Sequence, residues 1–203
     1  MKRIKLLITV LATFSSPAFS QSGDDQHTTD VFKVTILEPG ISFEKSTGRN
    51  QTAVAKIGAS FSGSFTSSSS MGNEATFVLD PALTLGYRFY YNYNKREEKG
   101  KRTAMNSLNY LSPVFETSYS KNAISSDYLV EEKRRLMNTV GLVWGIQRNY
   151  MKRFSLDLQL GAGYLFANSM ESGSGSGNTI HKMAGRATTI GRLSLGIWLN
   201  RKE

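Results

Sequence analysis

The sequence contains no cysteine among its 203 residues. Disulfide bonds are therefore excluded, as is the lipid-modified cysteine that anchors a bacterial lipoprotein. Beyond residue 20 the chain also lacks any apolar run of about 18 residues or more, so we expect no transmembrane helix. A chain of this composition must be stabilised in some other way than by cross-links.

Histidine is almost as scarce, with only His27 and His181 in the chain. No His, Asp or Glu cluster has metal-ligand spacing, and the glycines stand in alternating stretches instead of preceding a helix as in a phosphate loop. His181 beside several serines is a thin hint of a hydrolytic site. We therefore expect no metal, no cofactor and no catalytic residue, and a protein that is not an enzyme.

The first twenty residues form a segment of their own. Three basic residues, an apolar run over Leu6–Phe14 and a small-x-small motif at Ala18–Ser20 follow one another, which is typical of a secretory signal peptide. We interpret residues 1–20 as this signal for the Sec pathway and the polar residues 21–30 as a flexible leader. Residues 31–203 are then the folded domain.

Basic residues outnumber acidic ones, and the formal net charge is +9. The signal segment holds three of the 25 basic residues, so the rest of the chain has 22 basic and 16 acidic residues, or +6. Such a balance suits either nucleic acid or an anionic membrane surface. Because an exported protein seldom meets nucleic acid, we expect membrane lipid to be the partner.

Alternation of apolar with polar or small residues dominates the rest of the chain. It is clearest over Phe154–Asn168 and recurs over Thr76–Tyr91, Leu136–Arg148 and Ala187–Leu199. These stretches are about twice as long as soluble strands usually are, and long enough for transmembrane barrel strands. The second face carries Gly, Ser, Thr and scattered charges instead of the many Lys and Glu of a soluble exterior. Only Tyr128–Arg135 hints at a short helical turn.

Short and long breaks between these stretches set the expected topology. Ser46–Asn50 and Asn149–Arg153 are short, as periplasmic turns are, whereas the polar segments at 67–73, 121–133 and 169–182 resemble extracellular loops. The strand count is then even, and both chain ends lie in the periplasm. The expected strands are 32–37, 41–45, 52–66, 74–91, 108–120, 134–148, 154–168 and 186–199.

This pattern predicts an all-β fold, an eight-stranded antiparallel up-and-down transmembrane β-barrel with a side-chain-filled lumen. The first two strands are shorter than the rest, and Glu38–Gly40 would connect them tightly. A single bulged strand over 32–45 is the competing interpretation, and it would break the even count.

Four basic and four acidic residues fall on the face that such a barrel turns inward. An eight-stranded barrel is just wide enough for side chains to fill it, and charges buried there need partners. We therefore expect a salt-bridged plug without an open pore, with a proton path or a binding site as the alternative role. The residues are Lys33, Glu44, Lys56, Asp80, Arg88, Glu116, Asp157 and Arg192.

Aromatic residues gather where the fourth expected strand ends. Tyr87, Phe89 and Tyr91 alternate outward, as in an aromatic girdle at a membrane surface, and Arg88 between them points inward. The basic stretch Lys95–Arg102 is expected to form a periplasmic turn. Aromatic and basic residues also suit stacking on single-stranded nucleic acid, but the export signal and the split of the aromatics over two faces argue against it.

The stretch YRFYYNYNKREEKGKRTAMNSLNYLS, residues 87–112, resembles small, mostly uncharacterised outer-membrane β-barrel proteins of Bacteroidetes. GISFEKSTGRNQT, residues 40–52, is similar to their first periplasmic hairpin. The resemblance implies an outer-membrane barrel and carries no catalytic or ligand-binding residue. The matching positions are Tyr90, Tyr91, Asn92, Lys95, Arg96, Lys99, Gly100, Lys101, Thr103, Asn106, Ser107, Asn109, Tyr110, Leu111 and Ser112.

The sequence as a whole therefore predicts an outer-membrane barrel of structural or interaction type. Its expected partners are outer-membrane lipid and the barrel-insertion machinery. Either Trp198 replaces the usual C-terminal aromatic residue for that machinery, or the polar tail after it is tolerated. The first alternative is an exported soluble, lipocalin-like barrel that binds a small apolar ligand. The second is an outer-membrane lipid-modifying enzyme that uses His181.

Overall fold

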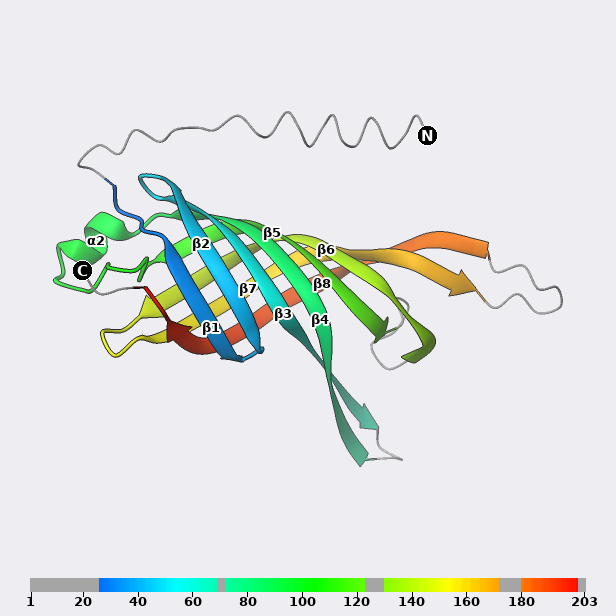
Figure 1. Ribbon diagram of the computed structural model, residues 1–203. Helices are drawn as coiled ribbons and strands as arrows, with labels where there is room; N and C mark the ends of the chain where they lie inside the picture. Colours follow the sequence, from blue (N-terminus) through cyan, green and yellow to red (C-terminus); the bar gives the residue numbers. More distant parts are fainter. Residues whose placement is uncertain (1–25, 69–71, 123–129, 172–179, 201–203) are drawn as a thin grey trace, which may run out of the picture.

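The computed structural model describes residues 26–68, 72–122, 130–171 and 180–200. Eight antiparallel strands form one sheet that closes on itself, because β1 pairs with β8 as well as with β2 (Figure 1). All other pairs join strands that are neighbours along the chain. The strands are β1 (Val31–Leu37), β2 (Gly40–Gly48), β3 (Gln51–Ser68), β4 (Gly72–Tyr90), β5 (Asn109–Asn122), β6 (Val130–Asn149), β7 (Phe154–Glu171) and β8 (Ile180–Trp198).

The pairing register keeps one kind of residue on each face of the sheet. In β7, Leu158 lies opposite Ile146 of β6 and Leu193 of β8, whereas the preceding Asp157 lies opposite Gln147. Neighbouring residues of a strand point to opposite faces. Apolar pairs therefore gather on the outer face of the ring and polar pairs on the inner face.

β1 and β2 are separate strands, and the interpretation of 32–45 as one bulged strand is wrong. Val31 pairs with Glu44 and Thr35 with Gly40, and Glu38 turns the chain with φ of 55°. The prediction of eight antiparallel strands is confirmed. The predicted boundaries fall short at the far end, where β8 begins at Ile180 instead of residue 186.

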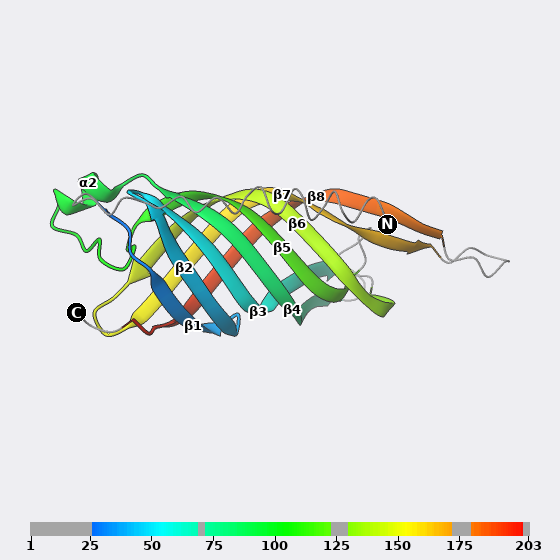
Figure 2. The same ribbon diagram turned by 45° about the horizontal axis from the view of Figure 1, so that its top comes forward.

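Both ends of the described chain, near Gln26 and Asn200, lie at one end of the ring, which we name the terminal end (Figure 1). The turns at 49–50 and 150–153 lie there, together with the long connection 91–108 between β4 and β5. At the opposite end, named the loop end, the β3–β4 and β7–β8 hairpins extend well beyond the ring (Figures 1 and 2).

The connection 91–108 differs from the simple turn expected at Lys95–Arg102. It contains the short helix α2 (Tyr93–Glu97) and continues through further turns to β5. A helix of five residues is too short to leave an apolar period in the sequence. The helical turn expected over Tyr128–Arg135 is wrong for its described part, because residues 130–135 belong to β6. No helix in the described segments is long and apolar enough to cross a membrane.

The ring has a polar interior and an apolar exterior. Of the buried residues in the described segments, 18 are polar or charged and nine are apolar. The exterior exposes large apolar side chains, with Ile36, Leu142 and Ile57 exposed by 70%, 69% and 62%. Among strand residues whose side chains the structure describes, the outward charges are Lys45 and Arg148 at the terminal end and Lys121 and Arg134 at the loop end, and the outward positions between these two levels carry no charge. This distribution is the reverse of that in a soluble barrel.

Candidate functional site

All eight charged residues that the sequence placed inward form ion pairs, and all of these pairs except Asp80–Arg134 lie inside the ring. Seven of them divide into two groups along the axis of the ring, one nearer the terminal end and one nearer the loop end. Lys33, Glu44, Arg88 and Asp157 form the terminal-end network. Lys56, Glu116 and Arg192, joined by Glu38, form the loop-end network. Asp80 lies apart and pairs with Arg134 at 3.2 Å.

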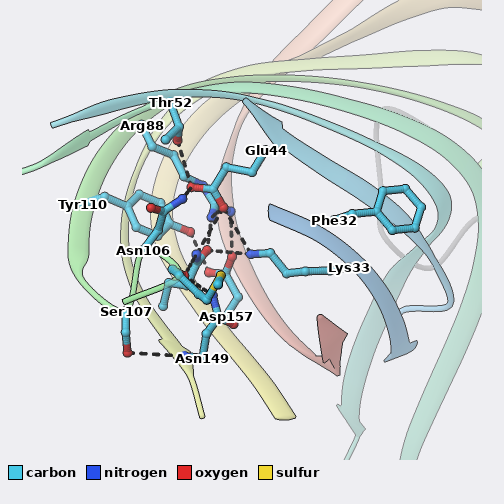
Figure 3. Close-up of polar contacts among 12 residues, drawn as sticks. Phe32, Lys33, Glu44, Thr52, Arg88, Asn106, Ser107, Tyr110, Asn149 and Asp157 are labelled. Carbon is cyan, nitrogen blue, oxygen red and sulfur yellow. Dashed lines mark hydrogen bonds and ion pairs between the residues drawn. The ribbon is translucent and has the colours of Figure 1, made fainter. Parts of the chain in front are cut away.

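The terminal-end network connects two cations and two carboxylates across the lumen (Figure 3). Lys33 Nζ lies 3.3 Å from Glu44 Oε2, and Arg88 reaches the same oxygen at 3.5 Å and Asp157 Oδ2 at 2.6 Å. The four residues are at most 8% exposed. Phe32, next to Lys33 in the chain, points away from the network (Figure 3). Equal numbers of opposite charges make this group neutral.

Uncharged donors complete the coordination of both carboxylates. Tyr110 donates to Asp157 Oδ1 at 2.6 Å, while Glu44 accepts hydrogen bonds from Tyr90, from Thr52 Oγ1 at 3.0 Å and from Gln147 Nε2 at 3.1 Å. Asn106 also donates to Glu44, at 2.8 Å. Removing a carboxylate from water costs several kcal/mol per ion. Ion pairs and hydrogen bonds to its oxygens offset this cost, so a carboxylate paired in this way can be buried.

The ring of Tyr110 forms one wall of the network. The guanidinium carbon of Arg88 lies 4.3 Å from its centroid, which is a cation–π contact. Space for the ring comes from Gly145, where a Cβ atom would lie 2.2 Å from Tyr110 Cζ. The sequence-based prediction missed Tyr110 as a member of the network. The only signal was its place in an alternating strand.

The loop-end network is less deeply buried. Glu38 pairs with Lys56 at 2.7 Å and with Arg192 Nε at 3.5 Å, and Arg192 also pairs with Glu116. Glu116 accepts further hydrogen bonds from Ser60 at 2.8 Å and Thr84 at 3.0 Å. Glu38 was missed because the sequence assigns it to a turn. In the ring this turn folds toward the lumen, and Glu38 is only 7% exposed.

A cavity of about 190 Å³ lies beyond the loop-end network. Its wall combines the charged groups of Glu38, Glu116 and Arg192 with apolar side chains such as Val114 and Ile190. A second cavity of about 40 Å³ lies between the two networks and is lined by members of both. The lumen is therefore filled at the terminal end and partly hollow toward the loop end.

Residues 26–30 lie across the terminal end and contact it closely, which differs from the flexible leader expected from their composition. Thr28 is 5% exposed and donates to the carbonyl of Gly48 at 2.8 Å. His27 stacks on Tyr93 with ring centroids 3.6 Å apart. The backbone N–H of Thr29 donates to Asn106. Polar residues can be held by hydrogen bonds that composition does not reveal.

The three aromatic residues singled out in the sequence lie on the outer face at the terminal end. Phe89 and Tyr91 are 43% and 56% exposed, while Tyr87 is half-buried and donates to Gln51 at 2.8 Å. Trp198 lies inward instead, 2% exposed, and donates to the carbonyl of Tyr150. Further outer aromatic residues of this end are Phe32, Phe43, Trp144, Tyr150 and Phe154.

Several sequence-based predictions fall outside the described residues. The signal peptide at 1–20 and the first part of the leader do so, as does the side chain of His181. Among the residues that the structure describes, no group of three or more His, Cys, Asp or Glu has the geometry of a metal site.

No protein-family model, curated protein or solved structure matches this chain. The resemblance of residues 87–112 to outer-membrane proteins of Bacteroidetes therefore stays a prediction. In the structure this stretch forms the end of β4, α2 and the start of β5. Among the inner residues described above, it includes Arg88, Tyr90, Asn106 and Tyr110.

Proposed function

We propose that this protein is an outer-membrane β-barrel of structural or interaction type, with a lumen closed by ion pairs and without catalytic activity. One observation carries the proposal: large apolar side chains cover the outside of the ring, while the charged ones are paired inside. A monomer in water rarely exposes so much continuous apolar surface. In lipid the same surface is favourable, and the closed ring satisfies the strand edges.

The distribution of side chains favours this function over a soluble ligand-binding barrel. A lipocalin-like barrel for an apolar ligand would need an apolar lumen and a charged exterior. Here Glu44 and Arg88 occupy the lumen, whereas Leu142 and Ile57 are exposed outside. An apolar ligand would have to lie beside buried charges, which is unfavourable.

The lumen is closed at the level of the terminal-end network, because seven of the eight strands each place a side chain there. Lys33, Glu44, Thr52, Arg88, Tyr110, Gln147 and Asp157 come from β1 through β7 in turn. Their side chains are joined by hydrogen bonds and ion pairs across the interior. A continuous aqueous path past this level is not expected, so we propose no open pore.

Fractionation of the cells that export the protein tests membrane localisation. The protein should sediment with the outer membrane, resist extraction by urea and carbonate, and migrate differently on gels when it is not boiled. Planar bilayers containing the folded protein should show no steady single-channel conductance. Recovery in the soluble periplasmic fraction would contradict the proposal.

A further inference from the structure

We propose that Arg96, Arg102 and Arg148, named the arginine cluster, bind the phosphate-bearing headgroup of an anionic phospholipid at the terminal end. This inference rests on the proposed membrane location. It adds a specific lipid site to a barrel whose surface would otherwise contact lipid only through apolar side chains.

Hydrogen bonds to the backbone tie the three arginine side chains to neighbouring parts of the terminal end. Arg96 Nη2 donates to the carbonyl of Arg102 at 2.9 Å, and Arg102 Nε donates to the carbonyl of Asn149 at 2.7 Å. Arg148 precedes Asn149 in β6 and donates to the carbonyl of Leu108 at 3.1 Å. The helix α2, the connection after it and the end of β6 are thus linked through these three side chains, and each contributes one cation to this part of the terminal end.

No carboxylate pairs with the arginine cluster within the described segments. This contrasts with the inner arginines Arg88 and Arg192, which each contact two acidic residues. Like charges close together repel, and a bound anion would relieve that repulsion. Glu97, the nearest acidic residue in the chain to Arg96, accepts a hydrogen bond from Tyr93.

The donors available to a ligand are chiefly those of Arg102, because Arg148 donates through both terminal amino groups, with Nη2 to Asn109 Oδ1 at 2.7 Å, and Arg96 donates through Nε and Nη2 to the carbonyl of Arg102. All three residues are half-buried, and none is fully enclosed by the protein. In the described part of the chain, Arg102 donates through Nε alone, which leaves its terminal amino groups for a ligand. A guanidinium group presents paired N–H donors that match two oxygens of a phosphate.

The position of the cluster points to lipid as the source of the phosphate. Arg148 lies on the outer face of β6, beyond Trp144, whose indole donates to the hydroxyl of Tyr91 at 2.7 Å. Tyr150, on the other side of Arg148, is 49% exposed. Exposed aromatic residues of this kind mark the headgroup level of a membrane. A cation beside them meets headgroups without leaving the barrel surface.

The charge of the whole terminal end supports an anionic partner. The described segments 26–30, 45–50, 91–109 and 148–154 hold ten basic and three acidic residues, a net charge of +7. That end therefore carries at least as much positive charge as the whole chain after residue 20, which is +6. Basic residues next to a membrane surface attract anionic lipids.

Spin-label spectroscopy on the full chain folded into vesicles tests this site. Spin-labelled phosphatidylglycerol is compared with spin-labelled phosphatidylcholine in vesicles of phosphatidylcholine, and the fraction of each lipid immobilised by the protein is measured. Wild type should select phosphatidylglycerol. In the variant R96Q/R102Q/R148Q the selectivity for phosphatidylglycerol should fall by about fivefold or more. In Arg102→Gln alone the selectivity should fall by less.

Two controls separate this site from general effects of charge. Lys45→Gln removes a cation from the same end that is already paired with Asp30 at 2.7 Å, and it should leave the selectivity unchanged. R96K/R102K/R148K keeps the charge but loses the forked donors of the guanidinium groups. Its selectivity should therefore lie between that of the wild type and that of R96Q/R102Q/R148Q. Gel migration without boiling shows whether each variant has folded.

The result that overturns the inference is an inserted wild-type protein that does not discriminate between the two lipids, or a glutamine variant that discriminates equally well. Loss of selectivity on adding inorganic phosphate, but not sodium chloride of equal ionic strength, would assign the site to free phosphate instead. Failure of the protein to insert into any vesicle would contradict the proposed function and is observed separately.

Discussion

Arg88 is the residue on which the terminal-end network depends most. It contacts both carboxylates, Glu44 and Asp157, and lies over the ring of Tyr110. Its removal leaves buried negative charges with fewer partners, whereas an exposed pair loses little because water screens it. Residue-scale energetics here are therefore set by depth in the lumen.

We expect Arg88→Met to lower the free energy of unfolding by about 3 to 5 kcal/mol. Lys45→Met is the matched control, because Lys45 and Asp30 form an exposed pair with side chains 60% and 41% accessible. That change should cost less than about 1 kcal/mol. Urea unfolding of the vesicle-folded protein, followed by tryptophan fluorescence, measures both values. Equal costs would mean that the inner pair contributes nothing special.

Leu158→Arg and Gln159→Arg place the same charge on opposite faces of β7. Leu158 lies on the outer face opposite Leu193, and Gln159 is 9% exposed inside. If the outer face contacts lipid as proposed, an arginine there costs about 2 to 4 kcal/mol at mid-membrane. We expect Leu158→Arg to slow insertion into vesicles and lower stability by this amount, while Gln159→Arg alters the lumen. If thickening or thinning the vesicle bilayer changes both variants alike, the assignment of faces is wrong.

Inner residues could be predicted from the sequence where they stand in a long strand. Period-two alternation places Lys33 and Asp157 inside, because the residues of the other parity next to them, such as Phe32, Val34, Leu156 and Leu158, are apolar. It could not find Glu38, which lies in a turn, or Asn106, which lies in the connection before β5. Their positions depend on how the loops fold over the ends of the ring, and no local pattern records that.

At the scale of elements, the strands and the connections differ in how well the sequence describes them. The four longest alternating stretches all became strands, and the short pair β1 and β2 followed from the even count. α2 escaped prediction because propensity is a weak signal over five residues. Residues 26–30 escaped it because their order comes from contacts with β2 and with the connection 91–108.

Asn106 joins three elements at the terminal end. Its side chain accepts a hydrogen bond from the N–H of Thr29, donates to the carbonyl of Thr29 at 2.7 Å and donates to Glu44. We expect Asn106→Ala to cost about 1 to 3 kcal/mol, because several buried polar groups lose a partner.

Hydrogen exchange measured by mass spectrometry checks this effect where it should occur. Residues 26–30 should exchange faster in Asn106→Ala than in wild type, while the strands keep their protection. Asn94→Ala, an exposed residue of α2, is the control and should change neither. Unchanged protection of residues 26–30 in Asn106→Ala would show that they are held by other contacts.

For the whole molecule, the two networks make the terminal end and the loop end unequal. Side chains of seven strands meet at the terminal-end level, whereas a cavity of about 190 Å³ remains beyond the loop-end network. The barrier to ions should therefore lie at one level of the lumen, close to the terminal end.

We expect E44A/R88A/D157A to conduct ions in planar bilayers, because an eight-stranded interior is kept closed by its side chains. The matched variant E38A/K56A/R192A removes as many charged side chains from the loop-end network. It should stay closed, since the terminal-end network remains. Conductance in the second variant alone would place the barrier at the opposite level.

The closure of β1 against β8 has a kinetic consequence. Lys33 of β1 reaches Gln147, 114 residues away, and Asn200 bonds to residues 168 and 170 positions earlier. Contacts between such distant parts of a chain form late, because a long loop must first be closed. We therefore expect ring closure to limit the folding rate. Until β1 pairs with β8, Arg88 of β4 and Asp157 of β7 lack the contact of their network with Lys33.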